Sequence, residues 1–379
     1  MRIVIAAGIF PPDIGGPATY AYELATALHA AGHSITVITF GDPAMQHDSP
    51  FRVIVIGRGN KLFSYFRYFV TLLQRSKNAD CIYAQGPVAG GLHAAWVSRL
   101  RGVPYVVKIT GDYAWEQAAI DPRFSVSIDA FQKSAGAISQ RIRVLRGIQR
   151  FVANHARKVI VPSQYLKRMV TGWRGRDQGI VVIYNAAPEL PADIDGMSLL
   201  ERDPIVVSVG RLVPWKGIDT VIRIWPRIKE RVQNAQLIIV GDGPDRQRLQ
   251  KLASSVSDIV FVGRTTAAET RKFYQRATCM VLNSSYEGFS HAILEAMQQG
   301  VPTLASDVGG NSELLQHERN GLLVAHNDER ALIDGLVLLL KDRKLAAMVG
   351  SQASIDAEQF SSTRMIDETI HLLSDVATK

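Results

Sequence analysis

The stretch Asn283–Gly321 reads NSSYEGFSHAILEAMQQGVPTLASDVGGNSELLQHERNG. An apolar segment at 279–282 comes directly before it and predicts a strand. The polar turn that follows leads into a predicted helix, which begins near Ser290 and ends at Gly300, with a proline opening the next strand. A helix N-terminus has free N–H groups and the positive end of a dipole, so this one suits a phosphate.

Two glutamates flank this helix N-terminus. Glu287 lies in the turn before the helix, and Glu295 lies one turn inside it. Helical side chains lean back toward the N-terminus, so Glu295 can reach the site that Glu287 borders. Two carboxylates that accept hydroxyl protons, beside N–H groups that hold phosphate, favour a sugar-nucleotide site. A solvated helix glutamate and an ordinary turn residue are the alternative.

The same block resembles the E-x7-E region of retaining GT-B glycosyltransferases, specifically glycosyltransferase family 4. The motifs E-G-F, E-A-M, G-x-P, G-G-N-x-E-L and N-G-L-L-V follow one another in the order of that family. The resemblance implies that Glu287 lies near the donor sugar and that Glu295 holds the ribose hydroxyls. It also implies an α/β fold of the GT-B type, in which two Rossmann-like domains face each other across a cleft.

Length and composition agree with a two-domain globular protein. The chain has 379 residues, which is long for a single core, with 47% hydrophobic and 21% charged residues. No apolar run approaches the roughly 20 residues of a membrane span, and residues 1–7 are interpreted as a first strand rather than a signal peptide. Cys81 and Cys279 stand in apolar runs. We therefore expect buried free thiols and a cytoplasmic protein.

Charge is distributed unevenly along the chain. Residues 1–190 contain 22 Lys/Arg and 11 Asp/Glu, whereas residues 191–379 contain 21 and 24. The first half is therefore expected to bind an anionic partner, such as phospholipid head groups, a pyrophosphate-bearing acceptor or nucleic acid. Nucleic acid would explain only the basic pI, because the sequence contains no recognised nucleic-acid-binding module, and we do not expect it as a partner.

Strand and helix signals alternate through both halves, starting with a β-α-β unit at 2–40. The polar, proline-marked segment 188–196 is the predicted boundary between an N-terminal domain, 1–187, and a C-terminal domain, 197–360. A last helix is expected within 363–379. The resemblance implies that this helix packs back on the first domain, that the first domain binds the acceptor, and that the second binds the nucleotide sugar.

Two loops of the first half are candidate binding elements. The loop GIFPPDIGG at 8–16 is not a dinucleotide fingerprint, because its spacing differs and it contains prolines. The resemblance implies that Gly16 approaches the donor phosphates and the acceptor, with a tight turn as the alternative. Asp112 follows a predicted strand, where many family members have a histidine. It could bind a sugar hydroxyl, orient the acceptor hydroxyl or cap the turn.

The second half offers cations for a departing diphosphate. The loop GRLVPWKG at 210–217 contains Arg211 and Lys216, both of which suit phosphate oxygens. In family 4 the matching pair grips the diphosphate without metal. The D-x-D at 193–195 is interpreted as polar linker, so we predict no metal site and no cofactor besides the donor. The remaining residues expected around the donor are Gly210, Gly241, Gly263, Gly288, Phe289 and Ser290.

These features predict an enzyme that transfers a hexose or N-acetylhexosamine from a nucleoside diphosphate sugar with retention of configuration. The expected acceptor is a glycan or a polyprenyl-linked molecule, and the expected process is cell-surface polysaccharide or glycolipid synthesis. A sugar-nucleotide epimerase or a phosphorylase with the same fold is the alternative.

Two basic segments indicate an anionic membrane surface as a further partner. The predicted helix 61–74 is rich in aromatic residues, and a second helix has arginines at helical spacing. We therefore expect peripheral docking at the inner face of the plasma membrane. Alternatively, the aromatics belong to the core, and the arginines form a solvated face or hold a charged soluble acceptor. The residues concerned are Phe63, Tyr65, Phe66, Tyr68, Phe69, Arg143, Arg146, Arg150 and Arg157.

Overall fold

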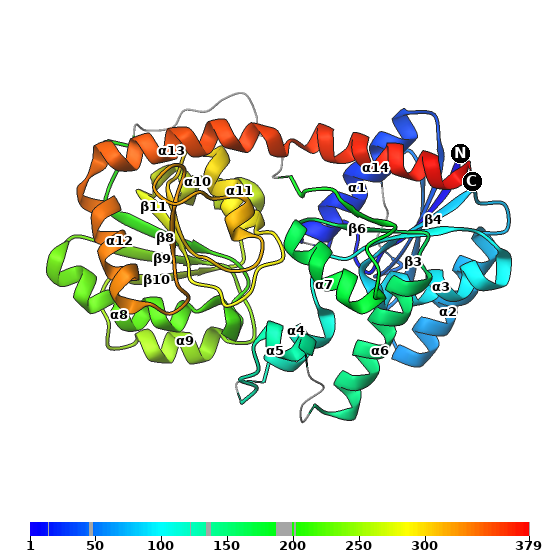
Figure 1. The fold of residues 1–379 in the computed structure, drawn as a ribbon, viewed down its shortest axis with the longest axis horizontal. Coiled ribbons are helices and arrows are strands. Elements are labelled where there is room, and N and C mark those ends of the chain that lie inside the picture. The colour runs from blue at the N-terminus through cyan, green and yellow to red at the C-terminus, as the bar shows by residue number, and fades with distance from the viewer. Residues whose placement is uncertain are drawn as a thin grey trace. The chain divides into compact units, whose positions relative to one another are not determined.

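The computed structural model describes residues 1–13, 15–44, 48–121, 123–133, 138–186, 199–200 and 202–378. The chain forms two compact units (Figure 1). The first unit contains Met1–Ala118, Asp129–Tyr184 and Thr363–Lys379, and the second contains Ala119–Ile128 and Asn185–Ser362. The segment 188–196, which includes the D-x-D, lies outside the described residues.

The first unit is built on a parallel sheet of seven strands in the order β3-β2-β1-β4-β5-β6-β7. The strands are apolar and mostly buried, as expected for a parallel sheet covered on both faces. β1 lies between β2 and β4, with Ile3 paired to Ile35 and to Cys81. The strands are β1 (Arg2–Ala6), β2 (Ser34–Gly41), β3 (Arg52–Gly57), β4 (Cys81–Gln85), β5 (Tyr105–Lys108), β6 (Lys158–Val161) and β7 (Ile180–Val182).

Right-handed crossovers determine which helices cover each face of this sheet. The step from β1 to β2 runs in one direction along the sheet and places α1 on one face. The steps that lead from β3 to β7 run the other way and place α2, α3, α6 and α7 on the opposite face, where neighbouring helices pack on one another. The helices are α1 (Gly16–Ala30), α2 (Lys61–Arg75), α3 (Gly91–Arg101), α4 (Tyr113–Ala119), α5 (Ile128–Lys133), α6 (Gln140–His155) and α7 (Gln164–Arg174).

The C-terminal helix α14 (Ser362–Ala377) packs on the first unit beside α1. The hydroxyls of Tyr20 in α1 and Thr369 in α14 are 3.1 Å apart and buried. Lys108 Nζ lies 3.6 Å from the centre of the Tyr20 ring and 3.9 Å from Met365 Sδ. Burial lowers the pKa of Lys108 to about 7. A residue near the end of the chain therefore contributes to the core of the N-terminal unit.

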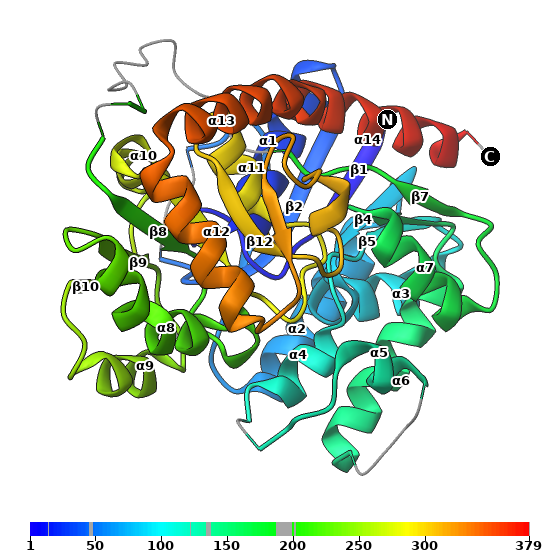
Figure 2. The ribbon, with the colours of Figure 1, turned by 60° about the vertical axis from the view of Figure 1, so that its left-hand side comes forward.

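The second unit repeats the design with six parallel strands in the order β10-β9-β8-β11-β12-β13. α8 and α12 pack on one another beside this sheet (Figure 2). The core lies between the sheet and the apolar sides of these helices, and the buried Trp225 is its largest side chain. The strands are β8 (Ile205–Val209), β9 (Gln236–Val240), β10 (Ile259–Gly263), β11 (Cys279–Leu282), β12 (Thr303–Ser306) and β13 (Leu322–Val324). The helices are α8 (Ile218–Arg231), α9 (Arg246–Ala253), α10 (Ala267–Arg276), α11 (His291–Gln298), α12 (Glu329–Lys341) and α13 (Arg343–Ala357).

These two sheets with flanking helices confirm the predicted α/β class with two Rossmann-like units. The apolar spacing of 329–349 predicts a single helix, and this prediction is wrong. The segment forms α12 and then α13, because the Asp342 side chain accepts the Leu345 N–H and starts α13. Short helices α4 and α5 and the full helix α7 were not predicted. Cys81 and Cys279 are free and buried, as expected, and burial raises the pKa of each thiol to about 12.

The residues expected to form a membrane surface divide between core and solvent. Tyr68 is buried, and its hydroxyl donates to the carbonyls of Ala7 and Ile38, whereas Phe63 and Phe66 are exposed. Arg146 is also buried and lies against the Phe131 ring, so the four arginines do not form one solvent-facing stripe. No helix in the described part of the chain is long and apolar enough to span a membrane.

Candidate active site

The carboxyl ends of the strands in the second unit are joined through glycines. Gly210 N donates to the Val240 carbonyl over 3.0 Å, and Gly241 N donates to the Gly263 carbonyl over 2.8 Å. A Cβ on Gly241 would lie 1.9 Å from the Gly210 carbonyl oxygen, so no larger residue fits without displacing the backbone. The end of a parallel sheet where ligands usually bind is therefore lined by backbone at this point.

Lys216 and Glu287 meet at this sheet edge. Lys216 follows β8, Glu287 follows β11, and the distance from Lys216 Nζ to Glu287 Oε1 is 2.5 Å. Ser284 Oγ donates to the same carboxylate oxygen over 2.6 Å. The two charged side chains retain only 16% and 10% exposure, so their interaction is screened less than a surface pair. Two of the predicted site residues, 71 positions apart, are brought together.

Backbone packing fixes the turn that contains Glu287. Gly310 N donates to the Glu287 carbonyl over 3.0 Å. A Cβ on Gly309, whose φ is 59°, would lie 1.9 Å from that same carbonyl oxygen. Ser290 caps α11 by accepting the Ile293 N–H, and the Phe289 ring packs edge-on against Phe360. The G-G-N sequence therefore acts as a support for the glutamate turn, because only glycine allows this close approach.

Arg211 lies in the same loop as Lys216, immediately after β8. It is exposed, and within the described part of the chain its guanidinium makes no ion pair. The segment after β9 holds this loop in place, because Leu212 N donates to the Asp242 carbonyl and Asp245 N donates to the Leu212 carbonyl. Arg211 is thus a cation on a rigid loop that remains available to an anionic ligand.

Glu295 occupies a different environment from Glu287. Its Oε2 accepts the Tyr274 hydroxyl at 3.3 Å, across a pocket between α10 and α11. Burial raises the pKa of this carboxyl to about 7. The pocket is small, about 30 Å³, and open to solvent, and its lining residues are Ala267, Thr270, Arg271, Tyr274, Glu295, Gln298 and Gln299. The structure thus places Glu295 beside Tyr274 in this small pocket, whereas Glu287 contacts Lys216.

The first unit places its two predicted residues in different settings. Gly16 begins α1, directly after Gly15, whose φ is 155°. Asp112 has no exposed surface, and its carboxylate accepts the Trp115 N–H and the side-chain amides of Gln132 and Gln149 at 2.6–3.0 Å. Among the alternatives left open by the sequence, this geometry favours a capping role, in which Asp112 positions the loop after β5.

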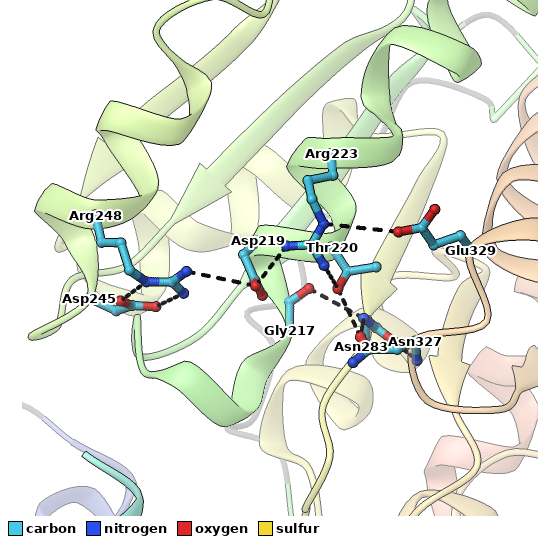
Figure 3. A network of polar contacts seen from close by, with 9 residues as sticks. All are labelled: Gly217, Asp219, Thr220, Arg223, Asp245, Arg248, Asn283, Asn327 and Glu329. Atoms are coloured by element: carbon cyan, nitrogen blue, oxygen red, sulfur yellow. Dashed lines mark hydrogen bonds and ion pairs between the residues drawn. The ribbon is translucent and has the colours of Figure 1, made fainter. Parts of the chain in front are cut away.

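A polar network that the sequence did not predict joins Asn283 to Gly217 and Asn327 (Figure 3). It ties the residue after Lys216 to the segment that leads to Glu287. Asn283, at the end of β11, donates to the Gly217 carbonyl and to Asn327 Oδ1, and it accepts the Asn327 N–H at 3.0 Å. Thr220 also donates to Asn327. Arg223 donates to both Thr220 and Asp219. Arg248, which pairs with Asp245, also lies near the Asp219 carboxylate. In the sequence, the only signal of this network was a polar residue directly after an apolar segment.

We expect Asn283→Ala to lower both stability and turnover. The substitution leaves the Asn327 N–H without its acceptor and removes one of the donors to the Gly217 carbonyl and to Asn327 Oδ1, a loss that typically costs about 2 kcal/mol. The loops of Lys216 and Glu287 then lose their common anchor, so kcat falls even at temperatures where the variant is folded. The matched control is Arg231→Ala, which removes an exposed ion pair with Asp334 and should leave both quantities almost unchanged. Full turnover by the folded Asn283→Ala variant would contradict the positioning role.

Comparison with known proteins identifies the class. Residues 15–186 match the family model for the glycosyl transferase 4-like domain, and residues 193–355 match the model for glycosyl transferases group 1. An uncharacterized glycosyltransferase of Methanocaldococcus jannaschii is 25% identical over 98% of this chain and 97% of its own length. A GDP-mannose-dependent alpha-(1-6)-phosphatidylinositol monomannoside mannosyltransferase of Mycobacterium tuberculosis is 34% identical over 43% of this chain and 45% of its own length.

The fold agrees with solved structures of the same class. The crystal structure of Anabaena HepE in complex with UDP has a TM-score of 0.75 and 21% identity, and the match covers 99% of this chain and 100% of that one. Fold and family models together define a glycosyltransferase of the GT-B class. The chain belongs to the group 1, family 4-like glycosyltransferases.

Proposed function

We propose that this glycosyltransferase transfers a hexose or N-acetylhexosamine from a nucleoside diphosphate sugar to a glycan or lipid-linked acceptor with retention of configuration. The observation that carries the proposal is the little-exposed Lys216–Glu287 pair at a glycine-lined sheet edge. One similar protein is a GDP-mannose-dependent mannosyltransferase and another was solved in complex with UDP, which supports a diphosphate donor. The experiment below identifies the nucleotide base and the sugar of the donor, and the acceptor.

In this proposal the cations act on the charge that develops on the diphosphate. The bond from the anomeric carbon to the diphosphate oxygen breaks as the bond to the acceptor oxygen forms on the same face of the sugar. The acceptor proton passes to the departing phosphate oxygen. Arg211 and Lys216 stabilise the leaving group, and Glu287 accepts a hydrogen bond from a sugar hydroxyl once Lys216 contacts phosphate. Glu295 holds the ribose hydroxyls, and Asp112 positions its loop.

The donor is identified by thermal protection of the full chain with a panel of UDP- and GDP-sugars. A ligand that binds only the folded state raises the melting temperature according to its concentration and affinity. The protecting donor is then incubated with lipid-linked and soluble glycan acceptors, and the anomeric configuration of the product is determined by NMR. Recovery of isomerised donor without transfer to any acceptor would indicate the epimerase alternative, and inversion would overturn the retaining mechanism.

We expect transfer to continue at an unchanged rate in EDTA. The fixed cations Arg211 and Lys216 take the role that a divalent ion has in other sugar-nucleotide enzymes. The assay compares initial rates after chelation with rates after re-addition of magnesium or manganese. Loss of activity in chelator that either metal restores would show that the cations are not sufficient.

A further inference from the structure

Charge in the first unit is separated between the two faces of its sheet. The layer of α2, α3, α6 and α7, called here the basic helical face, contains twelve lysine or arginine residues and no aspartate or glutamate. The helices on the other face, α1 and α14, contain Glu23, Asp367, Glu368 and Asp375 and only one basic residue, Arg364. The excess positive charge of the N-terminal half is therefore directed to one side of the sheet.

The basic charges of this face are available to a partner. Arg67, Arg99, Arg101, Arg141 and Arg143 are exposed, and none of them makes an ion pair among the residues that the structure describes. α3 packs between α2 and α6, so these residues share one continuous layer (Figure 1). The four helices themselves contain no carboxylate, and Asp129 of α5 lies beside Tyr165 of α7, so the surface is predominantly basic and attracts anionic groups.

Large apolar side chains are exposed on the same layer. In the first turns of α2, the exposed fractions of Leu62, Phe63 and Phe66 are 84%, 62% and 63%. Trp96 and Leu100 of α3 and Val144 of α6 are also exposed. Tyr68 and Leu72 hold the opposite side of α2 in the core, so the exposed residues are not displaced core residues. An amphipathic helix with aromatic and basic residues on its free side is typical of a helix that lies in a membrane interface.

The apolar group lies at a particular edge of the first sheet. α2 begins at Lys61, shortly after β3 ends at Gly57, so its first turns lie at the carboxyl ends of the strands. Ligands of parallel α/β sheets bind at this edge. A membrane that contacts Leu62, Phe63 and Phe66 would therefore present its head groups to the end of the unit where an acceptor is expected.

We propose that the basic helical face docks on an anionic lipid bilayer, with Leu62, Phe63 and Phe66 inserted among the head groups. The exposed arginines contact lipid phosphates, and each such charge strengthens binding roughly fivefold near an anionic leaflet. A soluble polyanion would match the charges, but it would not bury the exposed aliphatic side chains of Leu62 and Leu100. The choice of a lipid-linked acceptor rests on the proposed function, whereas the docking itself does not depend on catalysis.

The test is co-sedimentation of the full chain with phosphatidylcholine vesicles, with and without phosphatidylglycerol, in the absence of any donor. We expect binding only to the phosphatidylglycerol vesicles, and weaker binding at high salt because exposed charges are screened. The triple variant Leu62→Ser, Phe63→Ser and Phe66→Ser should lose about tenfold or more in partitioning, because buried CH₂ groups are removed. The triple variant Arg67→Glu, Arg99→Glu and Arg141→Glu should abolish binding.

Matched controls lie on the second unit. The variant Leu338→Ser, Met348→Ser and Ile355→Ser removes three exposed apolar side chains, and Arg227→Glu, Lys251→Glu and Lys344→Glu reverses three exposed charges. Both should bind like the wild type. Equal and negligible sedimentation with the two vesicle types would overturn the proposal, as would equal losses in the test and control variants. Binding of heparin or RNA without binding of vesicles would replace the bilayer with a soluble polyanion. Since no donor is present, each outcome is independent of whether the chain transfers sugar.

Discussion

Lys216→Ala should lower kcat/KM for the donor about a hundredfold while the protein remains folded, because removing one preorganised partner of a developing charge typically costs about 3 kcal/mol. The expected loss is mainly in kcat, since the charge on the departing diphosphate is greatest in the transition state. Lys216 is little exposed and pairs with Glu287, so the variant also leaves that carboxylate without its cation. The measurement is steady-state kinetics with the donor found by thermal protection.

Arg211→Ala should reduce turnover in the same direction, because its guanidinium is exposed on the same rigid loop. The matched control is Lys251→Ala, which removes an exposed lysine of α9 in the same unit. Its kinetics should equal those of the wild type. If Lys216→Ala and Lys251→Ala have the same kcat and KM, Lys216 has no role in the transfer step.

The second large effect separates the two glutamates. Glu287→Gln should lower turnover strongly but leave the affinity for the bare nucleoside diphosphate nearly intact, because its proposed partner is the sugar. Glu295→Gln should weaken binding of the nucleotide and of the intact donor alike, because a ribose contact persists throughout the reaction. Calorimetry of each variant with the nucleoside diphosphate measures the difference. Equal losses of nucleotide affinity would contradict these assignments.

Glu295 also gives a stability readout in the absence of ligand. Burial raises its pKa in the folded protein from an ordinary carboxyl value to about 7. The folded state therefore binds this proton more tightly than the unfolded state. The associated stability is fully present below the unfolded pKa, and it is lost as the pH rises through about 7. Glu295→Gln, which cannot ionise, should melt above the wild type at pH 8 and close to it at a pH below 4.5.

The sequence predicted the regular architecture of this chain because its signals are local. Apolar strands alternate with amphipathic helices, and glycines and prolines mark the ends, as at Ser290 and Gly300 around α11. The resemblance then named Arg211, Lys216, Glu287 and Glu295, and the structure brings Lys216 and Glu287 into contact. Their roles in catalysis remain predictions for the experiments above.

Features that depend on distant contacts could not be read from the sequence. Asn283 and Asn327 are 44 positions apart and meet only because β11 and the segment before α12 are neighbours in the fold. Helical spacing placed Arg146 in a stripe, but packing against Phe131 turned its side chain inward. The close approach of Gly309 to the Glu287 carbonyl likewise depends on how two loops pack together. The sequence motif of each loop could be recognised, but not their contact.

In the proposed function, the second unit holds a nucleoside diphosphate sugar through its diphosphate at Arg211 and Lys216. Calorimetric titration of the wild type and Lys216→Ala, in EDTA, with UDP or GDP and with the matching nucleoside tests this binding mode. We expect the wild type to bind the diphosphate far more tightly than the nucleoside, and Lys216→Ala to lose most of that difference while it still binds the nucleoside. Equal affinities of the wild type for diphosphate and nucleoside would contradict it.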